Sequence, residues 1–363
     1  MFSKKWFLVS VAIALFFGLV FTGCATEEVV DDVDVEEEVE EEVEEEVAVE
    51  EWEPSSPITI YVGFDAGGAV DLMTRALEPM LEEYLGVPIS VVNMSGAATA
   101  LATEHVFDAE PDGYTVLAPA TEIATMAVMG HADQTYEKWN MIGVNALVPN
   151  ILVVHPDSPF ETTDDLVAAL QAGDRLTISG AGDGCLWTRA AALVVEFSGA
   201  DLDQIEFIPA GGGFPSAQMA MRGEVAVASC GVPEVSEILP AGNVRALHWF
   251  GDEPITMEGY GEIRPITDYF PDAEPIPYGG WGGIALAEGT PDYIVDKWLE
   301  AYQYAVDHDD FRSFVDELGF LYMGLSGDEA RDFVKSITEA DSWMLYDMGL
   351  SEHSPEEFGI QRP

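Results

Sequence analysis

The chain from residue 57 onward alternates short apolar runs with segments of helical period. Ile58–Phe64 is an apolar run that ends in the turn residues Asp65 to Gly68. Such a run, closed by turn residues, predicts a buried strand. Apolar residues then recur at helical spacing, at Val70, Met73, Leu77, Leu81 and Tyr84. Gly86 follows as a helix stop, so this segment predicts a strand, a glycine turn and a helix.

The same order of elements continues along the chain. Further strands are predicted at 87–93, 114–118, 150–155, 176–179, 205–209, 225–229 and 284–287. Helices are predicted at 98–108, 186–197, 215–222, 291–307 and 328–345. Strands that alternate with helices predict parallel sheets with helices on both faces, and therefore an α/β fold.

Strands that run into glycine turns occur in both halves of the chain. The turns are Asp65–Gly68 in the first half and Gly180–Gly184 and Gly211–Gly213 in the second. A chain of 363 residues with 48% hydrophobic residues is long enough for two such cores. We therefore expect two lobes, each a mostly parallel sheet covered by helices. Lobe 1 would comprise 57–153 and 280–363, and lobe 2 would comprise 154–279.

The first 24 residues carry the pattern of a secretory signal. Lys4 and Lys5 precede an apolar stretch from residue 6 to 21, which leads into Phe21-Thr-Gly-Cys24. This end resembles the lipobox of a lipoprotein, which implies a signal peptide at 1–23 and lipidation of Cys24. The alternative is an uncleaved membrane anchor, although the stretch is shorter than the ~20 residues of a spanning helix.

Residues 27–53 are almost entirely Glu, Asp and Val, without a basic residue. Such a block repels itself and cannot bury enough apolar surface to fold. We interpret 24–56 as a disordered tether that follows the lipidated Cys24. An acidic interaction tail and a segment that buffers Ca²⁺ are the alternatives.

Acidity extends beyond the tether. Residues 27–53 hold 17 of the 67 acidic residues, and Lys4 and Lys5 are two of the 14 basic ones. The remaining 50 acids and 12 bases give a formal net charge of −38 after Pro54. This balance excludes nucleic acid as a partner, since nothing would neutralise phosphates. Self-repulsion at low ionic strength also suggests a saline habitat.

Signals for an enzyme are absent from the sequence. No Gly-x-Ser-x-Gly, His-Glu-x-x-His or Gly-Lys-Ser/Thr pattern occurs, and the six histidines are scattered without ligand spacing. We therefore expect no catalytic residue, no cofactor and no metal. Whether Cys185 and Cys230 form a disulfide stays open, because the sequence does not give their separation.

Three ordered motifs carry a resemblance to a known family. They are Phe64-Asp-Ala-Gly-Gly-Ala-Val-Asp71 with Arg75, Pro111-Asp-Gly-Tyr-Thr115, and Trp281-Gly-Gly with Glu288-Gly-Thr-Pro291. Their order and spacing resemble the substrate-binding subunit of tripartite tricarboxylate transporters, the Bug-type receptors. The resemblance covers nearly all of the chain after Pro57.

The resemblance implies a type II periplasmic-binding fold whose two lobes close on a ligand like a Venus flytrap. It implies a small organic anion, held mainly by backbone amides and ordered water, and a partner permease of two membrane subunits. We expect an extracytoplasmic monomer, anchored to the membrane by lipid. A solute sensor that signals to a membrane partner, or a hydrolase, is the alternative.

Glycine turns at the carboxyl ends of strands allow close backbone approach, and helix starts offer free N–H groups to an anion. On this argument, the candidate ligand-binding residues are Phe64, Ala66, Gly67, Gly68, Asp71, Asn93, Ser95, Gly96, Thr121, Gly180, Gly182, Asp183, Gly184, Gly211, Gly212, Gly213 and Gly231. For each glycine a plain tight turn is the alternative. For Asp71, which we expect to accept hydrogen bonds from turn amides or water, the alternative is a helix first-turn acid.

Departures from the usual family pattern bear on the ligand. Asp65, Glu122 and Asp183 add carboxylates to predicted cleft turns, and Pro209-Ala210 replaces the common Tyr-Lys. Unless a cation bridges the acids, these changes favour a mono- or dicarboxylate, or an anion with an amino group, over citrate.

Aromatic residues beside the turns are candidates for pocket walls or for core packing: Trp187, Phe214, Tyr278 and Trp281. Arg189 is the one base near the second-lobe turn. It either meets the ligand or pairs with a surface acid.

Overall fold

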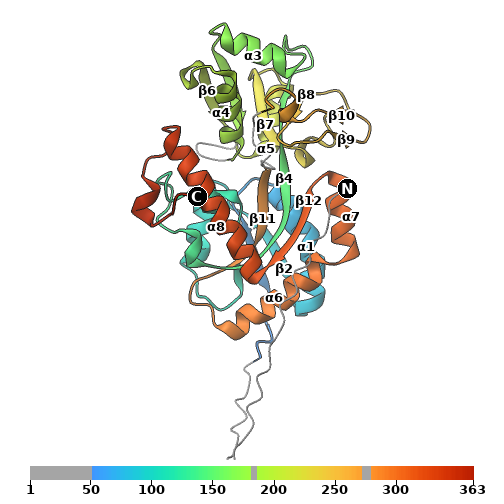
Figure 1. Ribbon diagram of the computed structural model, residues 1–363. Helices are drawn as coiled ribbons and strands as arrows, with labels where there is room; N and C mark the ends of the chain where they lie inside the picture. The colour runs from blue at the N-terminus through green and yellow to red at the C-terminus, as the bar shows by residue number, and fades with distance from the viewer. Residues whose placement is uncertain (1–50, 181–185, 272–278) are drawn as a thin grey trace, which may run out of the picture. The chain divides into compact units, whose positions relative to one another are not determined.

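Figure 1 shows the computed structural model, which describes residues 51–180, 186–271 and 279–363. All of the elements below belong to one compact unit, Val49–Pro363. The unit is two-lobed and contains eight α-helices within the described residues.

The first lobe begins with three parallel strands. β1 (Ile58–Val62) lies between β2 (Ile89–Asn93) and β3 (Thr115–Ala118) and pairs with both in parallel register. α1 (Ala69–Leu85) and α2 (Ala100–Phe107) connect them. The apolar face of α1 is buried, and Gly86 ends the helix in the left-handed conformation, with φ 72°.

One long strand, β4 (Trp139–Val154), runs through both lobes (Figure 1). Its residues 139–149 pair antiparallel with β11 (Gly279–Ala287), and part of the same stretch pairs with β12 (Leu321–Ser326). Its residues 150–154 pair with β7 (Val227–Gly231) and β8 (Arg245–Trp249). β4 therefore changes its partner strands between Pro149 and Asn150.

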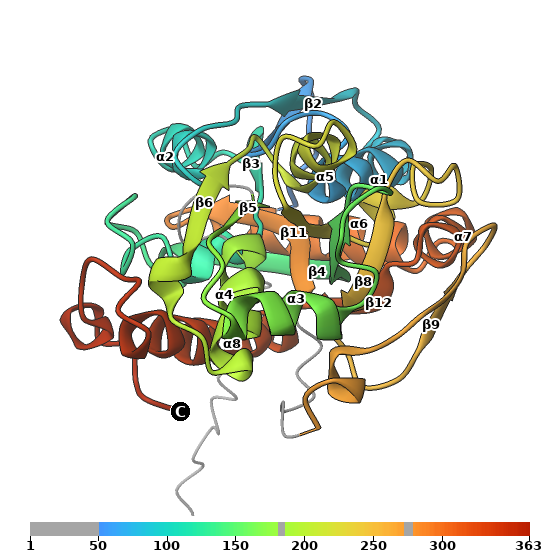
Figure 2. The same cartoon turned by 90° about the horizontal axis from the view of Figure 1, so that it is seen from above.

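The second lobe repeats the parallel arrangement. β5 (Leu176–Gly180) pairs in parallel with β6 (Ile205–Pro209) and β7. Its helices are α3 (Thr163–Gln171), α4 (Leu186–Ser198) and α5 (Gly213–Met221), and α3 packs beside α4 (Figure 2). A small antiparallel hairpin, β9 (Ile255–Met257) and β10 (Gly261–Ile263), completes this lobe.

The C-terminal helices return to the first lobe. They are α6 (Asp292–Val306), α7 (Asp309–Leu318) and α8 (Gly327–Asp347). α6 packs on α1, and the long α8 lies across β4 and β12 (Figure 1). Short 3₁₀ turns lie at η1 (Thr121–Ala124), η2 (Tyr136–Lys138), η3 (Leu202–Gln204), η4 (Pro233–Val235), η5 (Ile266–Asp268) and η6 (Pro355–Phe358).

The predicted α/β, two-lobed fold is confirmed, with differences in detail. β4 begins 11 residues before the predicted strand, and α3, α7, β8, β9, β10 and β12 were not predicted. α2 begins at Ala100, two residues late, because Ala97, Ala98 and Thr99 have φ of 46°, 47° and 75°, which a right-handed helix cannot contain. The exact lobe boundaries stay a prediction. None of the described helices is long and apolar enough to cross a bilayer.

Candidate functional site

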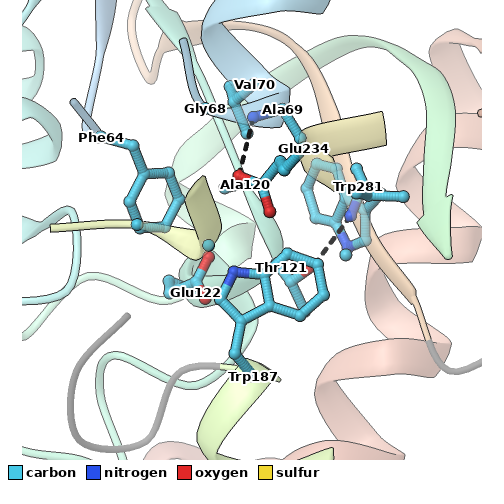
Figure 3. Close-up of a pocket in the computed structure, with 14 residues that line it drawn as sticks. Phe64, Gly68, Ala69, Val70, Ala120, Thr121, Glu122, Trp187, Glu234 and Trp281 are labelled. Atoms are coloured by element: carbon cyan, nitrogen blue, oxygen red, sulfur yellow. Dashed lines mark hydrogen bonds between the residues drawn. The ribbon is translucent and has the colours of Figure 1, made fainter. Parts of the chain in front are cut away.

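A cavity lies where the turns after several strands meet (Figure 3). Its cavity volume is about 20 Å³, and the space between its walls, part of which is open to solvent, is about 380 Å³. Its walls come from the start of α1, the turn after β3, β4, the first turn of α4, the start of α5, η4 and β11. The lining residues are Phe64, Gly68, Ala69, Val70, Ala120, Thr121, Glu122, Val148, Trp187, Gly212, Gly213, Glu234, Gly280 and Trp281.

Aromatic side chains form a large part of the wall. Phe64 comes from the turn after β1, Trp187 from α4 and Trp281 from β11. The backbone N–H of Trp281 donates to Thr121 Oγ1 at 3.0 Å, which ties β11 to the turn after β3 (Figure 3). Apolar walls of this kind suit a solute with an apolar or aromatic body.

Two carboxyl groups line the same cavity. Glu122 and Glu234 are 5% and 6% exposed. No Lys, Arg or His is among the described residues of the lining. The cavity is therefore acidic, and the described lining offers a carboxylate only backbone N–H, hydroxyl and indole N–H donors.

Glu234 bridges the starts of two helices and the end of a strand. Its Oε1 accepts from the N–H of Ala69 at 3.2 Å, and its Oε2 accepts from the N–H of Gly231 at 2.7 Å. Burial raises the pKa of Glu234 to about 7, although these amides and those of Gly213 and Phe214 act in the opposite direction. The carboxyl group therefore gains or loses its proton near neutral pH.

Glycines leave space for two acidic side chains of the protein, Glu234 and Asp65. A Cβ atom at Gly213 would overlap the carboxyl group of Glu234, and one at Gly231 would lie 3.0 Å from its Oε2. A Cβ atom at Gly211 would overlap the carboxyl group of Asp65. The sequence predicted that a ligand would lie close to these glycines. In the structure, the carboxyl groups of Glu234 and Asp65 lie there.

A network of hydrogen bonds around Asp71 fixes the turn after β1. Asp71 is buried and accepts from the N–H of Gly67 at 2.9 Å, from Arg75 Nε at 2.9 Å and from Asn93 Nδ2 at 3.0 Å. Asn93 Nδ2 also donates to the carbonyl of Phe64 at 2.9 Å. Asp71 therefore acts on the turn, and it is not among the residues that line the cavity.

The structure brings some of the predicted residues to this cavity and others to a neighbouring hollow. Phe64, Gly68, Thr121, Gly212 and Gly213 line the cavity. The neighbouring hollow shares Phe64 and is lined by Gly63, Ser95, Gly96, Ala97, Ala98, Thr99, His131, Pro209, Ala210 and Gly211. Asp65 lies at its edge, where its Oδ1 accepts from Ser95 Oγ at 2.5 Å.

The other predicted residues lie outside both linings. Ala66 and Gly67 form the outer part of the turn after β1. The carbonyl of Gly180 accepts from the N–H of Ala210 at 2.7 Å. Gly231 reaches the site through Glu234. The predictions for Cys24, Gly182, Asp183, Gly184 and Tyr278 fall outside the described residues.

Arg189 does not line the cavity. Its Nη1 lies 2.5 Å from Asp341 Oδ2, and both side chains are buried. The pair joins α4 of the second lobe to α8. Arg189 therefore pairs with an acid, as one of the two expectations had it, but the acid is buried rather than on the surface.

Cys230 is a free, buried thiol, and Cys185 falls outside the described residues. Burial and the charge of Glu234 raise the pKa of the Cys230 thiol. In the part of the chain that the structure describes, no three His, Cys, Asp or Glu side chains group as metal ligands would.

Comparison with known proteins gives the family. Residues 73–349 match the model of the tripartite tricarboxylate transporter family receptor. Protein BugT of Bordetella pertussis is 30% identical over 251 residues, which are 67% of this chain and 74% of that protein. A UPF0065 protein of Pseudomonas sp. strain P51 is 26% identical over 295 residues, 79% of this chain and 84% of that protein.

Solved structures show the same fold. The periplasmic binding protein BugD matches with a TM-score of 0.74 at 22% identity, over 82% of this chain and 99% of BugD. MatC from Rhodopseudomonas palustris, with bound malate, has a TM-score of 0.69 at 22% identity and covers 81% of this chain and 99% of its own. An R. palustris protein with adipate has a TM-score of 0.69 at 21% identity, over 85% and 99% of the chains.

Proposed function

The chain belongs to the tripartite tricarboxylate transporter family of receptors, and from this premise we propose that it is an extracytoplasmic solute-binding lipoprotein and not an enzyme. It captures a small organic carboxylate between its lobes and delivers it to a two-subunit membrane permease. The observation that carries this proposal is the partly open cavity at the starts of α1 and α5, whose walls come from both lobes.

The chemistry of the cavity supports a carboxylate of low charge. The first turn of α1 presents backbone N–H groups that have no partner inside the helix; that of Ala69 binds Glu234, and Val70 of the same turn lines the cavity. Glu122 and Glu234 in the wall oppose a highly charged anion, so a mono- or dicarboxylate suits it better than citrate. The malate and adipate in two related folds support the same class of solute.

The first residues of the chain support a location at the outer face of a membrane. We propose that residues 1–23 are removed as a signal peptide and that Cys24 carries the lipid. Residues 24–56 then tether the receptor to the membrane. A Cys24→Ala variant should move from the membrane fraction to the soluble fraction of the cell envelope. Retention of that variant in the membrane with residues 1–23 removed would contradict the anchor, because an uncleaved apolar segment 6–21 would itself hold the protein there.

Binding is tested by the thermal unfolding of purified protein in high salt with a panel of mono- and dicarboxylates. A solute that binds only the folded state stabilises it by about 2.7 kcal/mol at 100 times its Kd, which raises Tm measurably. Native mass spectrometry of the protein as purified would identify any solute that is retained. If no organic anion raises Tm and none is retained, the proposal is wrong.

Two tryptophan variants connect binding to the cavity. Trp187 and Trp343 are both 7% exposed, but only Trp187 is among the residues that line the cavity. Trp187→Leu should lose most of the ligand-induced rise in Tm, and Trp343→Leu should keep it even though both variants are less stable. An equal loss in the two variants would place the solute elsewhere.

A further inference from the structure

Glu234 occupies the point at which amides from both lobes converge. Its carboxyl group accepts hydrogen bonds from the N–H of Ala69, which is the first residue of α1, and of Gly231 at the end of β7. The amides of Gly213 and Phe214, at the start of α5, lie close enough to lower the pKa of this carboxyl group. Both helix starts therefore direct N–H groups at a single side chain of the protein.

These amides are the donors that a carboxylate of a solute would use. Helix starts favour an anion because their N–H groups are free and the helix dipole is positive there. In this protein the anion at the two helix starts is the carboxylate of Glu234, a residue of η4. The side chain of Glu234 fills the space above Gly213 and Gly231, as the overlap with an added Cβ atom at Gly213 shows.

What remains of the wall around Glu234 suits an apolar group. Phe64, Val148 and Trp187 line the same cavity, and Glu122 is the other carboxyl group in the lining. A second carboxylate that entered at this end would meet a protein carboxylate and amides that already have an acceptor. An apolar end of the solute would not be repelled by the carboxylate of Glu234 and would not need a hydrogen bond from these amides.

We propose that Glu234 determines specificity: its carboxylate takes the place of one solute carboxylate, so that the receptor prefers a monocarboxylate to the dicarboxylate of the same carbon chain. This inference rests on the proposed function, since it presumes that the cavity binds carboxylates. It narrows the solute to a single carboxylate on an apolar body.

The test compares matched solutes by isothermal titration calorimetry. Hexanoate is paired with adipate and butanoate with succinate, in high salt at pH 8, where Glu234 is largely ionised because its pKa is about 7. The wild-type protein, Glu234→Gln and Glu237→Gln are measured. Glu237 is an exposed acid three residues from Glu234, so its variant removes the same formal charge outside the cavity.

We expect the wild type to bind each monocarboxylate about tenfold or more tightly than the matched dicarboxylate. Glu234→Gln should reduce that ratio about tenfold by binding the dicarboxylate more tightly, and Glu237→Gln should leave it unchanged. A purely structural role for Glu234 would weaken both members of a pair equally and keep the ratio. An unchanged ratio in folded Glu234→Gln, or equal affinities in the wild type, overturns the inference while the proposed function stands.

Two other outcomes are also decisive. If Glu234→Gln does not fold, the wild-type ratio alone decides, and a dicarboxylate that binds as tightly as its monocarboxylate overturns the inference. If none of the three proteins binds any carboxylate, the proposed function fails and the inference fails with it. That result is distinct, because it yields no affinities to compare.

Discussion

Glu234 Oε1 accepts a hydrogen bond from the backbone N–H of Ala69 at 3.2 Å, across 165 residues of sequence (Figure 3). The bond joins η4, which follows β7 of the second lobe, to the start of α1 in the first. A buried acid therefore contributes to holding the lobes in the arrangement seen here. Its protonation state is expected to affect stability as well as binding.

The titration of Glu234 should make the free energy of unfolding depend on pH. Burial raises its pKa from 4.5 to about 7, so between these values the folded protein holds a proton that the unfolded chain has lost. Its contribution to the free energy of unfolding is therefore full below pH 4.5 and falls as the pH rises to about 7. The loss is about 3 kcal/mol, at 1.36 kcal/mol for each pKa unit.

Urea unfolding of the wild type and of Glu234→Gln at pH 5, 6, 7 and 8, in constant salt, measures this loss as a difference between the two proteins. Glu237→Gln serves as the control and should follow the wild type at every pH. A difference between the wild type and Glu234→Gln that stays constant from pH 5 to 8 would contradict the raised pKa.

Asp71→Ala should lower both stability and solute affinity. The variant leaves the N–H of Gly67 and the amide of Asn93 without this acceptor, which costs about 2 kcal/mol in the free energy of unfolding. Because the same network holds Phe64 through its carbonyl, the aromatic wall of the cavity should shift, and the solute should bind more weakly.

Glu78→Ala, on the same helix, is the control for Asp71→Ala: it removes a charge that also interacts with Arg75 but none of the hydrogen bonds of Asp71, so it should change both quantities less. Urea unfolding and calorimetry give the two quantities for each variant. Loss of stability with unchanged affinity would instead assign Asp71 the role of a helix first-turn acid alone.

Asp341→Asn should be strongly destabilising. The variant would remove the carboxylate that pairs with the guanidinium of Arg189, which is 1% exposed, and breaking a buried pair in this way costs about 3–5 kcal/mol. Asp347 lies on the same helix but forms an exposed pair with Arg362, so Asp347→Asn should change stability little. Similar denaturation midpoints for the two variants would show that the buried pair contributes little.

Salt should stabilise the folded protein. The 50 acids against 12 bases after Pro54 repel one another at low ionic strength. Between about 0.01 M and 1 M salt the Debye length falls from ~30 Å to ~3 Å, so most of this repulsion is screened. Tm should rise across a NaCl series, and an unchanged Tm would remove the argument for a saline habitat.

The regular part of the fold could be predicted because each element carries its own local signal. α1 has an apolar face of helical period and ends at Gly86, and both features are present in the structure. The first 11 residues of β4 could not be predicted, since Gly143, Asn145 and Pro149 disfavour a strand locally. Pairing with β11 and β12 overrides that preference, and a tertiary pairing has no local pattern.

The candidate site could be predicted only in outline. Glycine turns identified the backbone that surrounds the cavity, because a glycine after a strand is visible in one sequence. They did not identify the side chain, Glu234, that lies against that backbone. Glu234 is a single acid between Pro233 and Val235, and its only sequence signal is an acid among apolar residues shortly after a predicted strand. Its contact with Ala69 depends on the arrangement of both lobes.

The passage of β4 through both lobes has a consequence for cooperativity. Ile142 and Val148 of this strand pack in one core of the first lobe and Val144 in another, while Leu152 and Ile151 pack in separate cores of the second. Neither lobe can lose this strand and keep its own interior. The two lobes should therefore unfold in one transition, and separate expression of either lobe should not yield an independently folding domain.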